Sequence, residues 1–405
     1  MKILILKQWF DPEPTSKGLS FAKELQRQGH QVQILTGFPN YPEGKIYDGY
    51  KLKLYQREEI DGVSILRVAL YPSHDSSVIK RIFNYISFAF MAMLFGIFAT
   101  RKADIIYAYH PPLTVGIAAI FIKIFRRTPI VYDIQDMWPD TLQATGMLNN
   151  KKILNIVGWV CKSVYKFVDH IVVLSPGFKK LLVERGVPSD KINIIYNWCD
   201  EKKITRAQPI TIDHQFVLQD KFNIIFAGNM GKAQALDTIL DVAQALRIES
   251  KIQFVFVGEG TETIRLKRRS IDEKLDNVVF IPRMPMSQVG SILTSANILL
   301  VHLKKDILFE ITVPSKTQAY MAIGKPILMA VSGDAADLIQ KAQCGRVAIS
   351  EDIESIKNAI LEMYHLPIDE QRQLGLNAKD FYDEKLSLTS GVQQFIEVFE
   401  RVKKC

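Results

Sequence analysis

The sequence predicts an α/β protein made of two Rossmann-like domains, each with a parallel sheet, that face one another across a cleft. Three observations lead to this prediction. The chain has 405 residues, and a domain takes ~100–200 residues, so two domains are expected. Short apolar runs alternate with helix-length segments, which is typical of parallel sheets. The alternation stops at 200–220 and then resumes, which places a linker between the two sheets.

Each half of the chain supplies its own predicted strands. In the first half, a helix runs from about Gly18 to Gly29 between the first two strands. The apolar runs that we interpret as strands are 3–6, 32–35, 63–68, 105–109, 130–132, 171–174 and 192–195, then 222–226, 254–257, 278–281, 298–301, 327–329 and 346–349. We therefore expect domains at 1–200 and 201–385, with a helix over 386–405 whose apolar stripe packs back on the first domain.

Composition limits the partners and the chemistry. The net charge is +8, which favours anionic partners. There is no zinc-finger spacing, no aromatic RNA-binding signature and no arginine-rich tail, so we do not expect nucleic acid to bind. None of the four cysteines lies in a Cys-x-x-Cys pair, which is typical of reduced cytoplasmic thiols. No Asp-x-Asp motif occurs, so we expect neither a metal ion nor another cofactor.

The loops after the strands of the second half carry the candidate donor residues, because open parallel sheets bind ligands at the carboxyl ends of their strands. The first of these loops contains Gly228, Gly231 and Lys232 and precedes a helix. Glycines allow close backbone approach, and a helix N-terminus and a lysine attract anions, so this loop is a candidate cradle for a diphosphate. Ordinary packing of a strand-to-helix turn explains the same glycines equally well.

Three further segments extend this candidate site. Gly258 and Glu259 follow the next strand and Arg283 the one after it; all three are candidates for a nucleotide-base pocket, although taken singly a structural turn explains each. The third segment is more specific in the order of its residues. Pro314 precedes a helix start that Ser315 can cap, so the helix N-terminus faces an anion or a sugar hydroxyl.

In the first half, polar residues follow two predicted strands. Asp133, Asp136 and Trp138 lie at the end of one strand, and carboxylates beside a tryptophan suit recognition of an acceptor sugar. A capped turn, with Asp136 or Asp140 at the start of the next helix, is the alternative interpretation. His110 ends the preceding strand, where it is either an acceptor-site residue or a structural histidine.

These segments resemble glycosyltransferase family 4, whose members are retaining enzymes of the GT-B fold, and the resemblance covers nearly the whole chain. The runs 226–232 and 257–260 resemble the family's diphosphate and base loops, and 315–326 resembles its donor-site helix. Gly18 matches a glycine whose backbone approaches the donor phosphates. The run 312–318 is similar to O-antigen and capsule transferases thought to add N-acetyl-L-fucosamine from its UDP donor.

On the sugar side of the donor site, the sequence departs from this family. Many members carry two glutamates eight positions apart, and these positions are Ile311 and Ala319 here. Glu310 lies one residue away from the first position and is the candidate substitute.

Other family residues are also replaced. The arginine and lysine of the diphosphate loop fall on Asn229 and Gln234, which leaves Lys232 and Lys316 as candidate cations. A family histidine that contacts the donor sugar falls near Gln135, which we keep as an acceptor-side candidate.

The resemblance implies retaining transfer from a UDP-sugar to a saccharide on a lipid diphosphate, in O-antigen, capsule or exopolysaccharide biosynthesis. In the family mechanism, the departing phosphate accepts the acceptor's proton. Lys232 would stabilise that phosphate, Asp136 would orient the acceptor hydroxyl, and Glu310 would contact the sugar. Two other functions remain open: a sugar-nucleotide epimerase of the same fold, and a non-catalytic subunit that binds the nucleotide sugar.

An apolar run at 82–100 predicts peripheral contact with the inner face of the plasma membrane. It holds no charged residue in 19 positions. Basic residues flank it on both sides: Lys80, Arg81, Arg101 and Lys102. A spanning helix needs ~20 apolar residues, but a crossing would separate flanking strands that should pair in one sheet. We therefore expect the run to lie on anionic lipid through Phe88, Phe90 and Leu94; burial in the domain core is the alternative.

Overall fold

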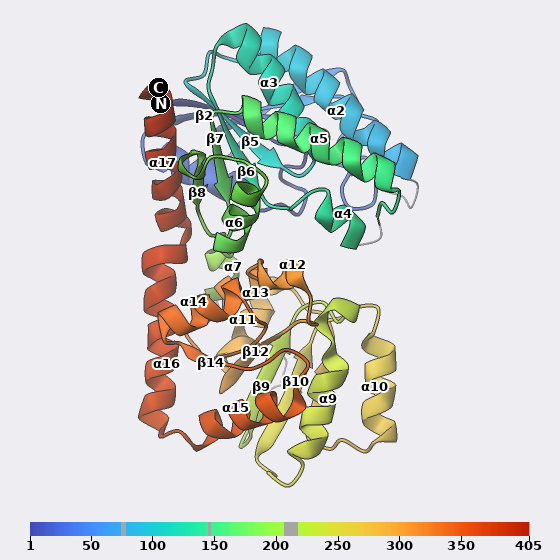
Figure 1. The fold of residues 1–405 in the computed structure, drawn as a ribbon, viewed down its shortest axis with the longest axis vertical. Coiled ribbons are helices and arrows are strands. Elements are labelled where there is room, and N and C mark those ends of the chain that lie inside the picture. Colours follow the sequence, from blue (N-terminus) through green and yellow to red (C-terminus); the bar gives the residue numbers. More distant parts are fainter. Residues whose placement is uncertain (74–77, 145–146, 206–217, 405) are drawn as a thin grey trace. The chain divides into compact units, whose positions relative to one another are not determined.

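The computed structural model describes residues 1–73, 78–144, 147–205 and 218–404 (Figure 1). Most of the linker expected at 200–220 lies outside these residues. The chain divides into two compact units, Met1–Ile195 with Val392–Cys405, and Tyr196–Gly391. The first unit therefore combines two separate stretches of chain, whereas the second is contiguous.

The first unit is built around an eight-stranded sheet with the strand order β3-β4-β2-β1-β5-β6-β7-β8. All neighbouring strands are parallel except β3 and β4. The strands are β1 (Lys2–Leu6), β2 (Gln31–Gly37), β3 (Tyr55–Ile60), β4 (Val63–Val68), β5 (Ile105–His110), β6 (Ile130–Ile134), β7 (His170–Val173) and β8 (Ile192–Ile194). Every residue of β5 and β6 is buried, as expected for a parallel sheet that is covered on both faces.

Strand β3 was not predicted from the sequence. It is an edge strand rich in polar residues, so it lacks the apolar run by which the other strands are found. A turn signal was nevertheless present, because Asp61 and Gly62 separate β3 from β4. Both residues have positive φ, 51° and 82°, as the tight Asp-Gly turn of a β-hairpin requires.

Helices cover both faces of this sheet. They are α1 (Leu19–Arg27), α2 (Val78–Phe98), α3 (Thr114–Arg126), α4 (Asp140–Ala144), α5 (Lys151–Phe167), α6 (Pro176–Glu184) and the last part of α17 (Leu388–Lys404). The buried ring of Tyr107 in β5 contacts Phe21 of α1 at 5.2 Å and Phe395 of α17 at 5.5 Å between ring centroids. The last helix is therefore part of the core of the first unit.

The second unit holds a six-stranded parallel sheet with the order β11-β10-β9-β12-β13-β14. Its strands are β9 (Phe222–Ala227), β10 (Ile252–Val257), β11 (Val278–Ile281), β12 (Ile298–His302), β13 (Ile327–Ala330) and β14 (Gly345–Val347). Its helices are α7 (Glu201–Thr205), α9 (Leu236–Ala245), α10 (Thr263–Asp272), α11 (Met286–Thr294), α12 (Ile307–Glu310), α13 (Ser315–Ile323), α14 (Asp334–Ala342), α15 (Ile353–His365) and α16 (Ile368–Phe381).

Alternate residues of these strands enter two different cores. Ile225 and Val255 pack with residues of α11, α13 and α14, whereas Ile224 and Phe254 pack with residues of α9 and α15. This alternation follows from the two-residue period of a strand, and it leaves the carboxyl ends of β9, β10, β12 and β13 at one edge of the sheet.

Candidate functional site

The loops after β9 and β10 meet at the carboxyl edge of the second sheet. Ala227 and Val257 pair in register, and the amide of Gly228 donates to the carbonyl of Val257 at 2.9 Å. Gly228 and Gly258 have φ of 140° and 128°, a conformation that residues with side chains rarely adopt. A Cβ on Gly258 would lie 2.2 Å from the carbonyl oxygen of Gly228. Packing between the two loops therefore already requires Gly258.

Lys316 lies beside this pair of loops, in the first turn of α13. Its Nζ is 3.5 Å from the centroid of the Phe226 ring and 3.2 Å from the position that a Cβ on Gly228 would take. The nitrogen is buried and has no hydrogen-bond partner among the described residues. Burial lowers the pKa of Lys316 to about 7. A buried amine left without a partner next to a glycine loop is a group that an anionic ligand would satisfy.

Tyr320 fixes α13 against the end of β9. Its hydroxyl accepts a hydrogen bond from the amide of Ala227 at 2.8 Å and donates to the carbonyl of the same residue at 3.2 Å. Pro314 occupies the N-cap position and Ser315 is the first helical residue, so the cap expected from the Ser315 side chain is not formed. The first amides of α13 therefore have no side-chain cap, which leaves them available to an anion.

The other predicted donor residues surround these loops. The Gln234 side chain accepts hydrogen bonds from the amide of Gly231 at 2.9 Å and from the side chain of Asn229 at 3.3 Å. Asn229 is thus held within its own loop, although its side chain remains exposed. The exposed charged residues that were predicted for this site are Lys232, Glu259 and Arg283.

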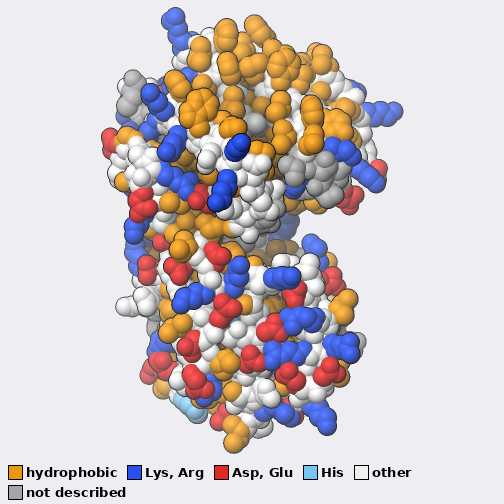
Figure 2. Space-filling model, turned by 45° about the vertical axis from the view of Figure 1, so that its right-hand side comes forward, with side chains coloured by type: hydrophobic (Ala, Val, Ile, Leu, Met, Phe, Trp, Pro, Cys, Tyr) orange, Lys and Arg blue, Asp and Glu red, His pale blue; other side chains and the backbone are white. Residues whose placement is uncertain are grey.

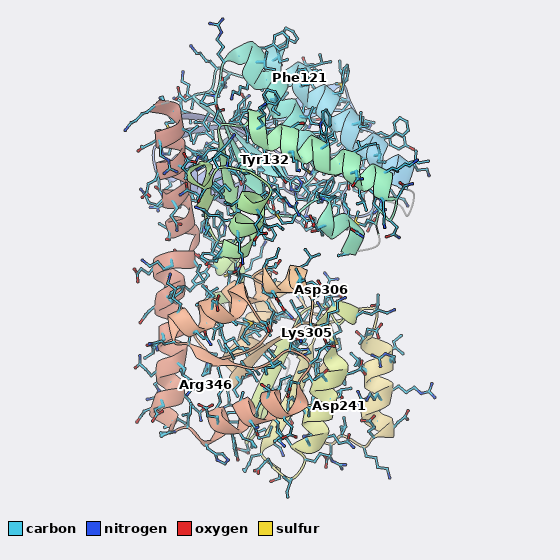
Figure 3. All side chains as sticks on the ribbon, viewed as in Figure 1. Phe121, Tyr132, Asp241, Lys305, Asp306 and Arg346 are labelled. Atoms are coloured by element: carbon cyan, nitrogen blue, oxygen red, sulfur yellow. The ribbon has the colours of Figure 1, made fainter. Side chains whose placement is uncertain are left out.

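Glu310 is the last residue of α12, in the segment that joins β12 to α13. Figure 3 labels Lys305 and Asp306, which precede it in this segment. The Glu310 side chain is half-buried. A Cβ on Gly333 would lie 2.1 Å from the carbonyl oxygen of Glu310, so the loops after β12 and β13 are in contact. Glu310 is therefore at the same sheet edge as the glycine loops.

His302, the last residue of β12, was not singled out in the sequence. Its ring is buried, with Nδ1 2.7 Å from the carbonyl oxygen of Gln234 and Nε2 accepting from the amide of Glu351 at 3.2 Å. These partners fit a neutral ring with its proton on Nδ1. Burial lowers the pKa of His302, which maintains that form. His302 therefore ties the loop after β9 to the end of β12. The only sequence signal was a histidine at the end of an apolar strand.

In the first unit, the structure corrects the assignment of Asp133 and Gln135 to the acceptor. The carboxylate of Asp133 is fully buried and accepts hydrogen bonds from Lys17 at 2.6 Å and from the hydroxyl of Tyr107 at 2.5 Å on Oδ2. Gln135 donates to Oδ1 at 2.6 Å. Both oxygens of Asp133 and the amide of Gln135 are thus used inside the unit, and we assign these residues a supporting role.

Gly18 also has an internal explanation. It is the N-cap residue of α1, and the carboxylate of Asp11 accepts from the amide of Leu19 at 2.7 Å. A Cβ at residue 18 would lie 2.2 Å from an Asp11 carboxylate oxygen. Glycine is therefore needed for this cap, with or without a donor phosphate. In the loop between β1 and α1, the Lys7 ammonium donates to Thr15 Oγ1 at 2.7 Å, and burial lowers the pKa of Lys7 to about 7.

Asp136 and Trp138 remain at the surface of the first unit, where the sequence placed them. Both side chains are half-buried. The pKa of Asp136 is raised because desolvation outweighs the opposing effect of hydrogen bonds from the side chains of Thr141 and Trp138. The contact with Thr141 of α4 is close to the capped turn that was the alternative interpretation. A partly exposed carboxylate with an indole beside it is still suited to a sugar hydroxyl.

His110 is buried, which argues against the direct acceptor contact expected from the sequence. Neither ring nitrogen has a hydrogen-bond partner among the described residues. Burial lowers the pKa of His110 to about 3, so the ring is neutral. Its ring lies 5.3 Å from Trp138 and 5.9 Å from Tyr132. We therefore assign His110 to the support of Trp138.

Trp138 belongs to a cluster of aromatic rings at the carboxyl edge of the first sheet. Tyr85 of α2 lies 6.4 Å from Trp138 and 6.2 Å from Trp9, and Trp9 lies 4.9 Å from Tyr41. Trp9 follows β1 and Tyr41 follows β2, so rings from several strand ends converge here. Trp9 and Tyr85 were not predicted from the sequence, although Trp9 follows soon after a strand end.

Two stretches of the chain match known families. Residues 19–198 match the Glycosyl transferase 4-like domain, and residues 210–381 match Glycosyl transferases group 1. WcaI of Escherichia coli strain K12, whose name describes a colanic acid biosynthesis glycosyl transferase, is 27% identical over 336 residues, 80% of this chain and 82% of that protein. WbjE of Pseudomonas aeruginosa, also named as a glycosyltransferase, is 25% identical over 247 residues, 59% of this chain and 61% of that protein.

Solved structures share the fold of the whole chain. HepE of Anabaena in complex with UDP has a TM-score of 0.69 at 13% identity, over 99% of this chain and all of that one. The catalytic domain of starch synthase IV from Arabidopsis thaliana, bound to ADP and acarbose, has a TM-score of 0.72 at 13% identity, over 100% and 99% of the two chains. These likenesses confirm the predicted GT-B fold of two parallel-sheet domains.

Proposed function

We propose that this chain, a glycosyltransferase with the GT-B fold, transfers a sugar from a nucleotide-diphosphate donor bound by its second unit to an acceptor bound by its first unit. UDP is the favoured nucleotide, because HepE, which shares the fold, was solved with UDP. A saccharide on a lipid diphosphate is the favoured acceptor, for a surface polysaccharide as the name of WcaI suggests. N-acetyl-L-fucosamine, to which the run 312–318 points, is the first donor sugar to test.

The observation that carries the donor site is the buried amine of Lys316, which has no hydrogen-bond partner in the described part of the chain. It lies next to Gly228, which is exposed, and in the first turn of an uncapped helix. The diphosphate would meet this amine, the amides at the start of α13 and the backbone of the 228–231 loop together. Lys232, which is exposed in the same loop, would supply a second positive charge.

These groups act on the step in which the donor's diphosphate leaves. The bond between the anomeric carbon and the phosphate oxygen breaks, and the acceptor oxygen bonds to that carbon on the same face. The released phosphate oxygen takes the acceptor's proton. Negative charge grows on the diphosphate during this step, so cations and helix amides held in place beforehand lower its barrier. Glu310, at the same sheet edge, is the candidate contact for a sugar hydroxyl.

The acceptor side is assigned to Asp136 and Trp138. The carboxylate of Asp136 would accept a hydrogen bond from the acceptor hydroxyl and orient it, while the ring of Trp138 would stack on a sugar face. Because the phosphate takes the proton, Asp136 is not required as the final base. Its replacement by asparagine, which preserves the shape but not the charge, should therefore reduce turnover less than a loss of Lys316.

A lipid-linked acceptor places the reaction at the inner face of the plasma membrane. We include in the proposal that the first unit binds this surface through the region 82–100 without crossing it. In support, α2 contains a 20-residue segment, Ile79–Phe98, that is apolar and long enough to span, yet only 28% of its most apolar window is buried.

The test is release of UDP from UDP-sugars in the presence and absence of a lipid-linked acceptor. We expect release that depends on the acceptor and a product with the donor's anomeric configuration. A change of the sugar nucleotide without any acceptor would identify an epimerase instead. Binding of UDP-sugars without turnover on any acceptor would identify a binding subunit. Turnover should persist in EDTA within about twofold, because helix amides and lysines would replace a divalent cation.

A further inference from the structure

Helices α2, α3 and α5 turn large apolar side chains outward from the first unit. These side chains are between 41% and 79% exposed: Ile79, Ile82, Phe83, Ile86, Phe90, Phe98, Phe121, Ile124, Phe125, Ile153, Ile156, Trp159 and Phe167. Together they present on the order of 1,000 Å² of apolar surface, more than a soluble monomer ordinarily leaves in one patch. Figure 2 shows hydrophobic side chains gathered over this part of the molecule, and Figure 3 labels Phe121 among its helices. We call these thirteen residues the apolar face.

The packing of α2 explains why its large residues point outward. The buried stripe of this helix repeats every four residues and consists of Asn84, Phe88, Ala92 and Gly96. A Cβ on Gly96 would lie 2.3 Å from Cδ1 of Ile122 in α3, so the two helices are in close contact. Phe88 is therefore a core residue, which corrects the expectation that it faces lipid. Apart from Phe88, the residues of this stripe are small or polar, whereas Phe83, Ile86 and Phe90 face outward.

The sheet topology excludes α2 as a spanning helix. Strands β4 and β5 lie on either side of α2 in the chain and belong to the same sheet, with β2 and β1 between them. A spanning helix would need its two ends on opposite sides of a bilayer. The contacts of Gly96 with Ile122 and Leu35 also hold α2 along the unit. The apolar face is therefore suited to lie on a surface.

The charges around the apolar face indicate which kind of surface it binds. Helices α2, α3 and α5 together contain eight lysines and arginines and no aspartate or glutamate. In α5, Lys151, Lys152, Lys162 and Lys166 are exposed beside Ile156 and Trp159. A second copy of this chain would bring the same positive charge to the interface, and like charges repel. A bilayer with anionic lipid offers both an apolar layer and negative headgroups.

One end of the apolar face reaches the candidate acceptor site. Tyr85 in the first part of α2 contacts Trp138 and Trp9, while its neighbours Phe83 and Ile86 belong to the apolar face. The hydroxyl of Thr114, at the start of α3, donates to the carbonyl of Tyr85 at 3.2 Å, which fixes this turn. The lipid-facing surface and the acceptor residues are thus parts of one rigidly packed region.

We infer that α2, α3 and α5 form a single surface that embeds flat in an anionic bilayer, with Tyr85 marking where this surface meets the acceptor site. The acceptor is then an amphiphile taken from the plane of the membrane. The embedding stands on the exposed side chains and charges alone. Only the identity of the acceptor rests on the proposed function.

The test measures binding to vesicles by flotation, using neutral phosphatidylcholine and a mixture with phosphatidylglycerol. We expect the wild-type protein to float with the anionic vesicles and to be released by detergent more than by salt. Replacing Phe83, Phe90 and Phe125 with serine should lower the partition coefficient at least about 100-fold, since three large apolar groups leave the lipid. The matched control is Ile264→Ser with Ile271→Ser on α10, which are even more exposed but lie in the second unit.

A second measurement reports the location of the surface directly. Of the four tryptophans, all within the described residues, Trp159 alone is mostly exposed. Its fluorescence should shift to shorter wavelength on anionic vesicles and be quenched by brominated lipid. Trp159→Phe should remove the shift while leaving vesicle binding within about twofold, because the ring that replaces the indole is also apolar.

Several outcomes would overturn the inference. Wild-type protein that stays in solution with anionic vesicles excludes a membrane surface. Self-association that the triple serine variant abolishes, without vesicle binding, makes the face a protein interface. Equal loss in the α10 control means that the effect is not specific. A circular-dichroism spectrum and a urea unfolding midpoint like those of the wild type confirm that the serine variants are folded in lipid-free buffer. Absence of UDP binding by the wild type would contradict the donor proposal while leaving the membrane result intact.

Discussion

Lysine side chains have buried amines at the carboxyl edges of both sheets, but the two edges differ in whether the protein supplies hydrogen-bond partners for these amines. In the first unit, Lys17 forms an ion pair with Asp133 at 2.6 Å, and Lys7 donates to Thr15 and to the carbonyl of Ser16. In the second unit, the amine of Lys316 is buried and has no hydrogen-bond partner among the described residues. Burial lowers the pKa of all three lysines.

The contrast separates structural cations from those kept for a ligand. An amine whose partners are built into the protein holds a loop in place, and its removal should affect folding. An amine that has no hydrogen-bond partner, and only an aromatic ring beside it, costs desolvation energy that a bound anion would offset. On this reasoning the two lysines at the first sheet edge are already satisfied, whereas Lys316 at the second is kept for an anion.

The largest effect is expected from Lys316→Met, which keeps most of the length of the side chain but removes its charge. Turnover should fall by on the order of 100- to 1,000-fold, because stabilisation of the leaving diphosphate is lost. The melting temperature should stay the same or rise. Lys325→Met, at the other end of α13, is the matched control and should remain within about twofold of the parent. Steady-state kinetics of the two variants measure this difference in turnover. Equal activity of the two would show that Lys316 does not act in the donor site.

Lys17→Met should show the opposite pattern. It leaves the carboxylate of Asp133 buried without its cation, which costs about 3–5 kcal/mol of stability. Urea unfolding measures this loss, and adding Asp133→Asn should restore a substantial part of it. Binding of UDP by the folded fraction should be unchanged, because the residue belongs to the first unit. A variant as stable as the wild type would show that the pair is not important for folding.

Donor binding should depend on pH through Lys316. Its pKa is about 7 in the empty site, and a bound diphosphate would raise it. Binding is therefore strongest below pH 7. Between pH 7 and the raised pKa of the complex, the affinity falls by at most about tenfold per pH unit, because binding there is coupled to the uptake of one proton. Calorimetry of UDP-sugar binding in two buffers with different ionisation heats measures this proton. Lys316→Met should bind weakly and without this dependence; an unchanged slope in that variant would assign the proton to another group.

The smallest effect is expected from Lys232→Ala. This lysine is exposed, so water and salt screen its charge. Turnover should fall by about tenfold or less, and the fall should shrink as the salt concentration rises. A loss as large as that of Lys316→Met, independent of salt, would reverse the ranking of the two cations.

Much of the fold followed from the apolar runs, because parallel strands buried on both faces need them. All thirteen runs interpreted as strands correspond to strands of the two sheets, with ends that differ by a few residues. The polar edge strand β3 has no such run and was missed. The site could not be predicted in the same way, because the sequence does not show whether a polar residue at a strand end binds a ligand or a neighbouring residue.

Asp133 illustrates what the sequence could not supply. Its partner Lys17 is far away in the chain, and no local pattern connects them. His110 was ambiguous for the same reason, since its burial depends on Trp138 and Tyr132. For Lys316 the sequence supplied a candidate, but only the structure reveals that its amine is buried beside Gly228 and Phe226 with no hydrogen-bond partner among the described residues.

Because the first unit includes part of α17, it cannot be completed during synthesis until that helix has been made. When the ribosome has completed residue 195, every strand of the first sheet exists, but the ring of Tyr107 still lacks Phe395 and Phe399 of α17. The second unit is contiguous and can fold as soon as it has emerged. The first unit stays open on one side until the last helix is synthesised. Its α2, α3 and α5 have by then long left the ribosome, so the apolar face is exposed before α17 closes the first unit.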